Sequence, residues 1–397
     1  MSGLLTIDEA LGHIVDHARL LPVEMVLVGD AAGRVLREPA RASVDLPPFP
    51  SSAMDGFALR AADAPGELPI AFRVAAGTAP PGPLPDGSAA GISTGGTVPE
   101  GADAVVPVEV VDDRGTHVAI SEPATAGQHV RPRGGDVREG DTVAEPGTRL
   151  GPAQIGALAA AGIAGVACSE RPLVAILATG SELRSAGEAL AAGQIFESNR
   201  AMVAAVLERV SAEVEVLPVV ADDAAAHREA IARGLEADVL VTSGGVSMGE
   251  HDLVRRIEAE LGVQEIFWGV AIKPGKPISF GVRDGTLVFG LPGNPVSSLV
   301  GALVFVSTGL RAAQGAADPL PRYGMGRTRV ALRRNAHRDE FLRAARSDDG
   351  NEVVLEAIAG QESHMIARAS AADALVHVPR GDGEIAAGSL VRFLALD

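Results

Sequence analysis

Short apolar runs alternate with amphipathic stretches between residues 171 and 317. The runs at 173–178, 214–220 and 237–242 are rich in β-branched residues, and apolar positions repeat every three to four residues in the stretches between them. The runs predict buried parallel strands, and the stretches predict helices. This alternation predicts a doubly wound, mostly parallel α/β domain at 171–317.

Two other regions have a different pattern. Residues 43–140 contain many short β-like runs among glycines and prolines, which predicts a small β domain. Residues 325–397 also alternate in short runs and predict a second small β domain. At the start of the chain, Thr6 and Glu9 have the spacing of a capping box and predict a helix.

The third predicted strand leads directly into a glycine loop. Ser243, Gly244 and Gly245 follow the strand, and a helix with apolar residues at every fourth position starts near Leu253. A strand end and a helix N-terminus both present backbone N–H groups, which suit an anion such as a phosphate. The alternative is a plain tight turn, and the loop alone does not decide between them.

Acidic residues follow each of the three predicted strands. They are Glu182, Asp222 and Asp252. Because the carboxyl ends of parallel strands lie at one edge of a sheet, the three side chains are expected near one another. Carboxylate oxygens suit a hard cation such as Mg²⁺. Alternatively, Asp222 and Asp252 only cap helices and Glu182 is only solvated.

The two lysines of the chain lie three residues apart. The other basic residues are arginines, whereas Lys273 and Lys276 both lie in the segment AIKPGKP. A compact ammonium group in an arginine-rich chain suggests a phosphate or oxyanion contact, although coincidence is the alternative. The segment LPGNPVSS at 291–298 predicts a rigid turn that leads into an apolar helix at 297–306.

Composition restricts the partners and the compartment. The net charge of −17 argues against nucleic acid or an anionic membrane as a partner. Cys168 is the only cysteine, so disulfides are not expected and a reducing compartment fits. The start of the chain has no signal-peptide pattern, and the apolar stretches 153–168 and 297–306 are too short to span a bilayer. We therefore expect a cytoplasmic protein.

Several motifs, in their order along the chain, resemble one known family. TGSEL, TSGGVSMGEHD, KPGKP and LPGNPVSS resemble the molybdopterin molybdenumtransferases of the MoeA family, which includes the C-terminal domain of gephyrin. SAMDGFAL at 52–59, STGGTVPEGADAVVPVE at 93–109 and QESH at 361–364 extend the resemblance over nearly the whole chain.

The resemblance implies a multidomain fold of the α/β plus β class. Its α/β molybdopterin-binding domain is similar to MogA and MoaB, its first domain is discontinuous around an inserted β domain, and its C-terminal domain resembles a β-barrel. The implied domains are 1–42 with 141–170, 43–140, 171–317 and 318–397.

The resemblance also implies a reaction and a set of site residues. Adenylylated molybdopterin and molybdate would be the substrates, with Mg²⁺ bound at the acids, AMP released, and a homodimer sharing each site between two chains. Contact with other molybdenum cofactor biosynthesis proteins is also implied. The implied catalytic residues are Asp55, Thr94, Asp136, Glu182 and Asp252. The implied metal ligands are Glu182, Asp222 and Asp252. The implied ligand-binding residues are Ser243, Gly244, Gly245, Ser247, Lys273, Lys276, Pro292, Pro295, Arg343 and Ser363.

The chain departs from the family pattern at two positions, and two other functions stay open. Gly135 stands where relatives usually carry an acid, and Gly269 where bacterial relatives often carry a lysine. The alternatives are the adenylyltransferase, which shares the α/β domain, and a non-catalytic pterin-binding scaffold. The extra domains favour the molybdenumtransferase over the first, and the intact acids favour it over the second.

Overall fold

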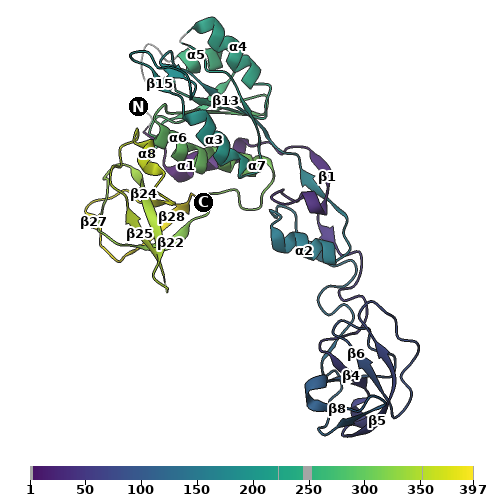
Figure 1. The fold of residues 1–397 in the computed structure, drawn as a ribbon. Helices are drawn as coiled ribbons and strands as arrows, with labels where there is room; N and C mark the ends of the chain where they lie inside the picture. The colour runs from purple at the N-terminus through teal and green to yellow at the C-terminus, as the bar shows by residue number, and fades with distance from the viewer. Residues whose placement is uncertain (1–2, 222, 245–252, 351, 397) are drawn as a thin grey trace.

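The molecule is elongated, with its two ends joined by a narrow section. The computed structural model describes residues 3–221, 223–244, 253–350 and 352–396. An α/β part and a C-terminal β part lie side by side at one end, and a separate β part lies at the other (Figure 1). Strand β1 (Val23–Leu27) and helix α2 (Pro152–Ala160) lie in the section between them. The predicted multidomain α/β plus β class is confirmed.

The α/β part is built on a six-stranded sheet in the order β16-β13-β17-β21-β20-β18. The first four strands are parallel, and β20 is antiparallel to both of its neighbours. Nearly all residues of β13 and β17 are buried, as their continuous apolar runs predict. The strands are β13 (Leu173–Ala178), β16 (Glu213–Val216), β17 (Val239–Ser243), β18 (Gln264–Trp268), β20 (Ser279–Arg283) and β21 (Thr286–Leu291).

Helices bury apolar side chains against both faces of this sheet. One core forms under α3 and the long helix that runs from α6 through η4 to α7, and a second core forms under α4 and α5. Asp223 caps α4 by accepting a hydrogen bond from the Ala226 N–H, and Asp222 lies outside the described residues. The helices are α3 (Asn199–Glu208), α4 (Ala224–Gly234), α5 (Leu253–Glu260), α6 (Pro295–Gly301), η4 (Ala302–Val306) and α7 (Ser307–Ala313).

Helix α1 (Ile7–His17) packs against the α/β core. The predicted capping box of Thr6 and Glu9 is present at its start. Its buried residues Ile7 and Ile14 join the same core as Phe289 of β21. The amphipathic pattern predicted which face of this helix is buried but not that the α/β core would bury it, and the predicted domain boundary at residue 42 stays a prediction.

The helix at Pro295–Ala313 is longer than the predicted 297–306. Its length and composition would allow it to cross a membrane, but 89% of the apolar window is buried inside the protein. Val304, Phe305 and Leu310 are fully buried in the α/β core. These apolar side chains thus pack against protein.

Two short antiparallel pairs and α2 form the section between the two ends. Strand β1 pairs with β12 (Gly165–Ser169), and β2 (Ala40–Arg41) pairs with β11 (Thr142–Ala144). The small core contains Leu36, Leu150, Leu158 and the thiol Cys168, all fully buried.

The β part at the far end contains a six-stranded sheet in the order β7-β4-β6-β5-β9-β8. A short pair, β3 with β10, lies beside it. All of these strands fall within the predicted inserted domain. They are β3 (Ser51–Ser52), β4 (Gly56–Leu59), β5 (Gly66–Val74), β6 (Ala89–Ile92), β7 (Ala104–Pro107), β8 (Val111–Asp113), β9 (His117–Ile120) and β10 (Val130–Arg131).

The C-terminal part is a closed five-stranded barrel. Strand β24 pairs with both β25 and β26, and this closes the ring β24-β25-β22-β28-β26. Strand β19 (Ile272–Lys273), from the α/β part, adds to β24 and so joins the two parts. The barrel strands are β22 (Gly324–Thr328), β24 (Asp339–Asp348), β25 (Val353–Ala357), β26 (Ala374–Val378) and β28 (Leu390–Ala395).

Candidate functional site

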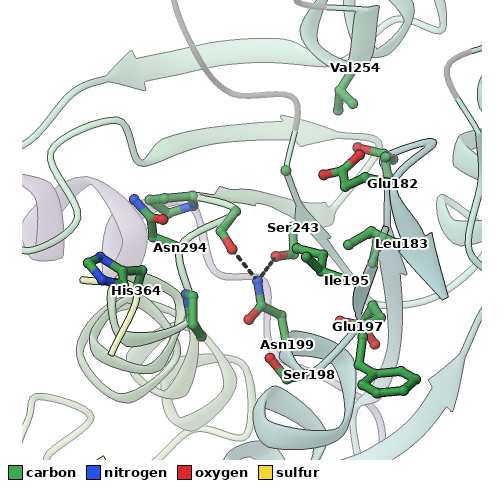
Figure 2. A pocket seen from close by; sticks show the side chains of 18 of the residues that line it. Glu182, Leu183, Ile195, Glu197, Ser198, Asn199, Ser243, Val254, Asn294 and His364 are labelled. Carbon is green, nitrogen blue, oxygen red and sulfur yellow. Dashed lines mark hydrogen bonds between the residues drawn. The ribbon is translucent and has the colours of Figure 1, made fainter. Parts of the chain in front are cut away.

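A cavity of about 740 Å³ lies at the carboxyl ends of β13, β17 and β21 (Figure 2). Five predicted site residues line it, and each lies at or shortly after the end of one of these strands or at the start of α6. Because parallel strands point the same way, residues far apart in sequence meet at this edge. These residues are Glu182, Ser243, Gly244, Pro292 and Pro295.

Asn199, which sequence reasoning missed, joins two walls of the cavity. Its Nδ2 donates to Ser243 Oγ at 2.8 Å and to the Gly293 carbonyl at 2.8 Å, as Figure 2 shows. A carbonyl oxygen only accepts, so the contact with Gly293 fixes which end of the amide faces it. The amide thereby ties the end of β17 to the turn before α6. The only sequence signal was its place at the start of a predicted helix.

Replacing Asn199 by alanine should weaken substrate binding more than a matched change elsewhere. The variant removes two buried hydrogen bonds and should cost about 1–3 kcal/mol of stability. Gln314 is the control, because its buried Nε2 also donates to two carbonyls, those of Val210 and Leu310, but away from this cavity. Thermal denaturation and substrate KM should separate them: both lose stability, and only Asn199→Ala raises KM. An equal KM in the two variants would contradict this role.

Gly244 turns the chain at the start of the glycine loop. Its φ is +95°, and a side chain there would place Cβ 2.7 Å from the Thr179 carbonyl oxygen. Its N–H donates to the Leu291 carbonyl at 3.1 Å. This N–H is therefore engaged within the protein, and the ligand-binding role implied for Gly244 stays a prediction. Gly245 and Ser247 lie outside the described residues.

Of the three predicted metal ligands, Glu182 is the one that lies within the described residues. Its carboxylate lines the cavity (Figure 2), and Gly180 leaves it room, because a Cβ there would lie 2.6 Å from Glu182 Oε2. Asp222 and Asp252 lie outside the described residues. Within the described ranges no three histidine, cysteine or acidic side chains gather as a metal site. A carboxylate oxygen is the donor that Mg²⁺ prefers, so the described ligand fits this ion.

The two lysines do not line this cavity. Lys273 Nζ is 3.1 Å from Glu340 Oε1, and the lysine lines a separate cavity of about 590 Å³ beside the barrel. Arg333 and Arg334 line the same space. Lys276 is exposed. The structure thus places the lysine charge at the junction with the barrel.

Arg343 is fully buried, whereas an arginine in solvent or facing a ligand would expose its guanidinium. Its guanidinium donates to the carbonyls of Gly360, Glu362 and Met365 at 2.6, 3.1 and 2.6 Å. This geometry holds residues 358–366 in place, and it does not present the guanidinium to an oxyanion. The guanidinium thus faces protein carbonyls, and the ligand-binding role that the resemblance implied for Arg343 stays a prediction.

The segment held by Arg343 reaches the cavity. The Ser363 carbonyl accepts a hydrogen bond from the Val296 N–H at 3.0 Å, in the first turn of α6. His364, a second residue missed from the sequence, lines the cavity (Figure 2). Ser363 is half-buried behind it. The barrel thereby contributes one wall of the site.

A buried ion pair forms another part of the wall. Glu197 Oε2 lies 2.9 Å from Arg200 Nε, and their side chains are 5% and 13% exposed. Sequence reasoning missed Glu197, which lines the cavity. Since a buried carboxylate needs a charged partner, the contact with Arg200 holds the Glu197 side chain in place.

The remaining predicted catalytic residues of the described chain do not line this cavity. Asp55 Oδ1 accepts a hydrogen bond from the Thr94 N–H at 2.7 Å, so these two loops meet. Asp136 is exposed, and its N–H donates to the Leu46 carbonyl at 2.9 Å. Asp55 precedes β4 and Thr94 follows β6, both at the far end (Figure 1), whereas Asp136 lies in the chain between β10 of that end and β11 of the narrow section.

Comparison with known proteins covers nearly the whole chain. Three family profiles match in succession: the MoeA N-terminal region (domains I and II) at 5–162, a probable molybdopterin binding domain at 175–312, and the MoeA C-terminal region (domain IV) at 325–396. The molybdopterin molybdenumtransferase of Haemophilus influenzae is 34% identical over 396 residues, which cover 98% of each chain. The chain belongs to the MoeA family.

Other MoeA relatives agree in sequence and in fold. Molybdopterin molybdenumtransferase 2 of Mycobacterium tuberculosis is 37% identical over 374 residues, covering 90% of this chain and 91% of the relative. A crystal structure of the molybdopterin biosynthesis MoeA protein from Pyrococcus horikoshii OT3 is 28% identical and superposes with a TM-score of 0.84, covering 98% of this chain and 99% of that one.

The backbone accounts for the two positions at which this MoeA chain departs from the expected pattern. Gly269 has a φ of +90°, and a Cβ there would lie 2.8 Å from the Leu4 side chain. A lysine would be strained at this position. At Gly135 a Cβ would come within 3.0 Å of Pro132, so an acid would require Pro132 to shift.

Proposed function

We propose that this protein is a molybdopterin molybdenumtransferase that takes adenylylated molybdopterin and molybdate and releases AMP in molybdenum cofactor biosynthesis. The cavity at the strand ends supports this proposal. Glu182 lines it together with Ser243 and Gly293, which Asn199 joins by hydrogen bonds. The cavity lies in the part of the chain that matches a probable molybdopterin binding domain. Incubation with adenylylated molybdopterin, Mg²⁺ and molybdate should yield AMP and metallated pterin. Tight pterin binding without AMP release would favour the scaffold alternative.

In this proposal Glu182, with Asp222 and Asp252, holds Mg²⁺. The ion would supply positive charge that neutralises the substrate phosphates. Pro292 and Pro295 fix the turn between β21 and α6, which Asn199 anchors through Gly293. The chain's own residues therefore orient the bound molecule, while Glu197 with Arg200 and His364 form parts of the wall.

We further propose that the lysines hold phosphate or oxyanion charge where the barrel meets the α/β part. Strand β19 fixes Lys273 against β24, and Glu340 orients its ammonium group. Arg333 and Arg334 add positive charge around the same cavity. This placement supports entry of molybdate from the barrel side.

Replacing Lys273 or Lys276 by arginine should lower turnover about tenfold, because a planar guanidinium cannot reproduce a compact charge-assisted contact of about 1.5–3 kcal/mol. The chain has no other lysine, so Arg171→Lys, at an exposed position, is the matched control. Steady-state AMP release measures the effect, and circular dichroism checks the fold. Wild-type turnover in both lysine variants would show that neither lysine has to supply compact charge to a phosphate or oxyanion.

We propose that the working unit is a homodimer in which each site combines residues of two chains. Asp55 and Thr94 lie beside β4 and β6, at the opposite end of the same chain from the cavity (Figure 1), so a second chain is the source that can bring them to it. Asp136 would reach the site from the same second chain. We also place the protein in the cytoplasm, with contact to other proteins of the same biosynthesis. The buried free thiol Cys168 is consistent with a reducing compartment.

A further inference from the structure

Four arginines surround a second, smaller cavity of about 180 Å³, away from the substrate site. It lies where four segments meet: the chain before α2, the end of α3, the end of α7 with the linker after it, and β28. Val206, Leu303 and Leu394 form apolar walls. The arginines are Arg149, Arg209, Arg311 and Arg322.

The described residues that line this cavity include no carboxylate. Arg149 donates only to carbonyls, with Nη2 2.7 Å from that of Arg209, and Arg311 Nη1 is 3.4 Å from the Leu320 carbonyl. Arg322 Nε lies 3.9 Å from Asp318 Oδ2, outside the lining, and both side chains are mostly exposed. An exposed pair at this distance contributes little.

Arg149, Arg311 and Arg322 bring like charges together, and Asp318 lines a smaller neighbouring cavity with the same three arginines. Burial lowers the pKa of the Arg311 guanidinium, and the charges of Arg149 and Arg322 lower it further, against a smaller opposite effect of Asp318. Burial, Arg322 and Arg209 likewise lower the pKa of Arg149. The groups stay charged and repel one another. The cluster is therefore a local concentration of positive charge in a protein of net charge −17.

Helix ends account for only half of the cluster. Arg209 follows the last turn of α3 and Arg311 lies in the last turn of α7, where a positive charge is favourable. Arg149 and Arg322 lie outside helices, so this effect does not explain why they point into the same cavity.

We propose that this cavity binds a compact multivalent oxyanion, with inorganic phosphate as the representative ligand, between Arg149, Arg311 and Arg322. Guanidinium groups bind tetrahedral oxyanions through paired hydrogen bonds. The cavity is several times the volume of about 30 Å³ that one water occupies, which leaves room for such an ion. It is too small for a nucleotide beside four arginines, so we assign it to a free oxyanion.

A bound oxyanion would connect three parts of the chain. Arg149 belongs to the narrow section, Arg311 to the α/β part and Arg322 to the linker before the barrel. Because a ligand that binds only the folded state stabilises it, phosphate should raise the unfolding temperature in proportion to the logarithm of its concentration above Kd. The site would thus fix how these parts are joined.

Calorimetric titration of phosphate into the full chain at constant ionic strength tests the proposal. Arg149→Gln with Arg311→Gln should lose one binding site per chain, or weaken it about tenfold or more, because two charge-assisted contacts are removed. Arg171→Gln, an exposed arginine elsewhere, should bind phosphate like the wild type. The double arginine variant should keep AMP release, since neither residue lines the substrate cavity.

Further variants separate this site from other sources of phosphate binding. The double variant Lys273→Gln and Lys276→Gln should still bind phosphate at the arginine site. In this double variant, sulfate should displace the bound phosphate, whereas AMP should not. If the double arginine variant does not fold, Arg322→Gln, at a side chain 72% exposed, should still weaken phosphate several-fold because it removes one contact.

Two results would overturn the proposal. The first is equal phosphate affinity and stoichiometry in the arginine variants and in Arg171→Gln. The second result concerns an anion that the chain itself supplies. Arg209 Nη1 donates to the Leu396 carbonyl at 2.6 Å, one residue before the last position of the sequence. Asp397 follows it in sequence and lies outside the described residues. If phosphate binds only after Asp397 is deleted, a carboxylate of the chain, and not a free oxyanion, is the partner of these arginines.

Discussion

Replacing Glu182 by glutamine should lower Mg²⁺-dependent release of AMP about tenfold or more, because the amide loses a charge-assisted contact of about 1.5–3 kcal/mol. Glu182 lines the cavity, and its carboxylate packs against Gly180, so glutamine fits the same space. The expected signature is a higher Mg²⁺ concentration for half-maximal rate. A fall in rate without a shift in the Mg²⁺ titration would contradict metal binding.

Glu188→Gln is the matched control for this experiment. Glu188 is exposed, follows the same strand and does not line the cavity. It should keep wild-type activity and Mg²⁺ dependence. If Glu182→Gln and Glu188→Gln behave alike, Glu182 is only a solvated acid. That is the alternative given from the sequence, and the Glu182 side chain is exposed.

Mixing two inactive variants, Asp55→Ala and Glu182→Ala, should restore about a quarter of wild-type activity if two chains share each site. Random exchange makes half of the dimers mixed, and each mixed dimer has one site with both defects and one with neither. The distance between the two ends of one chain motivates the test (Figure 1). Mass measurement of the mixed dimers confirms exchange.

The control is a pair of variants whose defects lie on the same side of the shared site. Asp55→Ala mixed with Thr94→Ala should stay inactive, because these residues meet in one chain through the 2.7 Å hydrogen bond and every site then carries a defect. Recovery in this pair, or none in the first pair after exchange, would contradict a site built from two chains.

Features that depend on nearby residues were predicted well from the sequence. The apolar runs predicted β13 and β17, and the spacing of Thr6 and Glu9 predicted the start of α1. The strand ends then predicted that Glu182 and Ser243 line one cavity. These predictions succeed because strand period, capping and parallel order follow from local rules.

Features that depend on distant partners were not predicted. The burial of Arg343 follows from three carbonyls of a segment about twenty residues away. Asn199 gains its role only once β17 and the turn before α6 lie on either side of it. The arginine cavity joins four segments that no sequence pattern links. The predicted domain boundaries and the roles of Asp222 and Asp252 stay predictions.

The most direct test measures AMP and metallated pterin together in one incubation with adenylylated molybdopterin and Mg²⁺, with and without molybdate. The account predicts that both products form in equal amounts when molybdate is present, and that Glu182→Gln slows both equally. AMP release with no metallated pterin when molybdate is present would contradict the account.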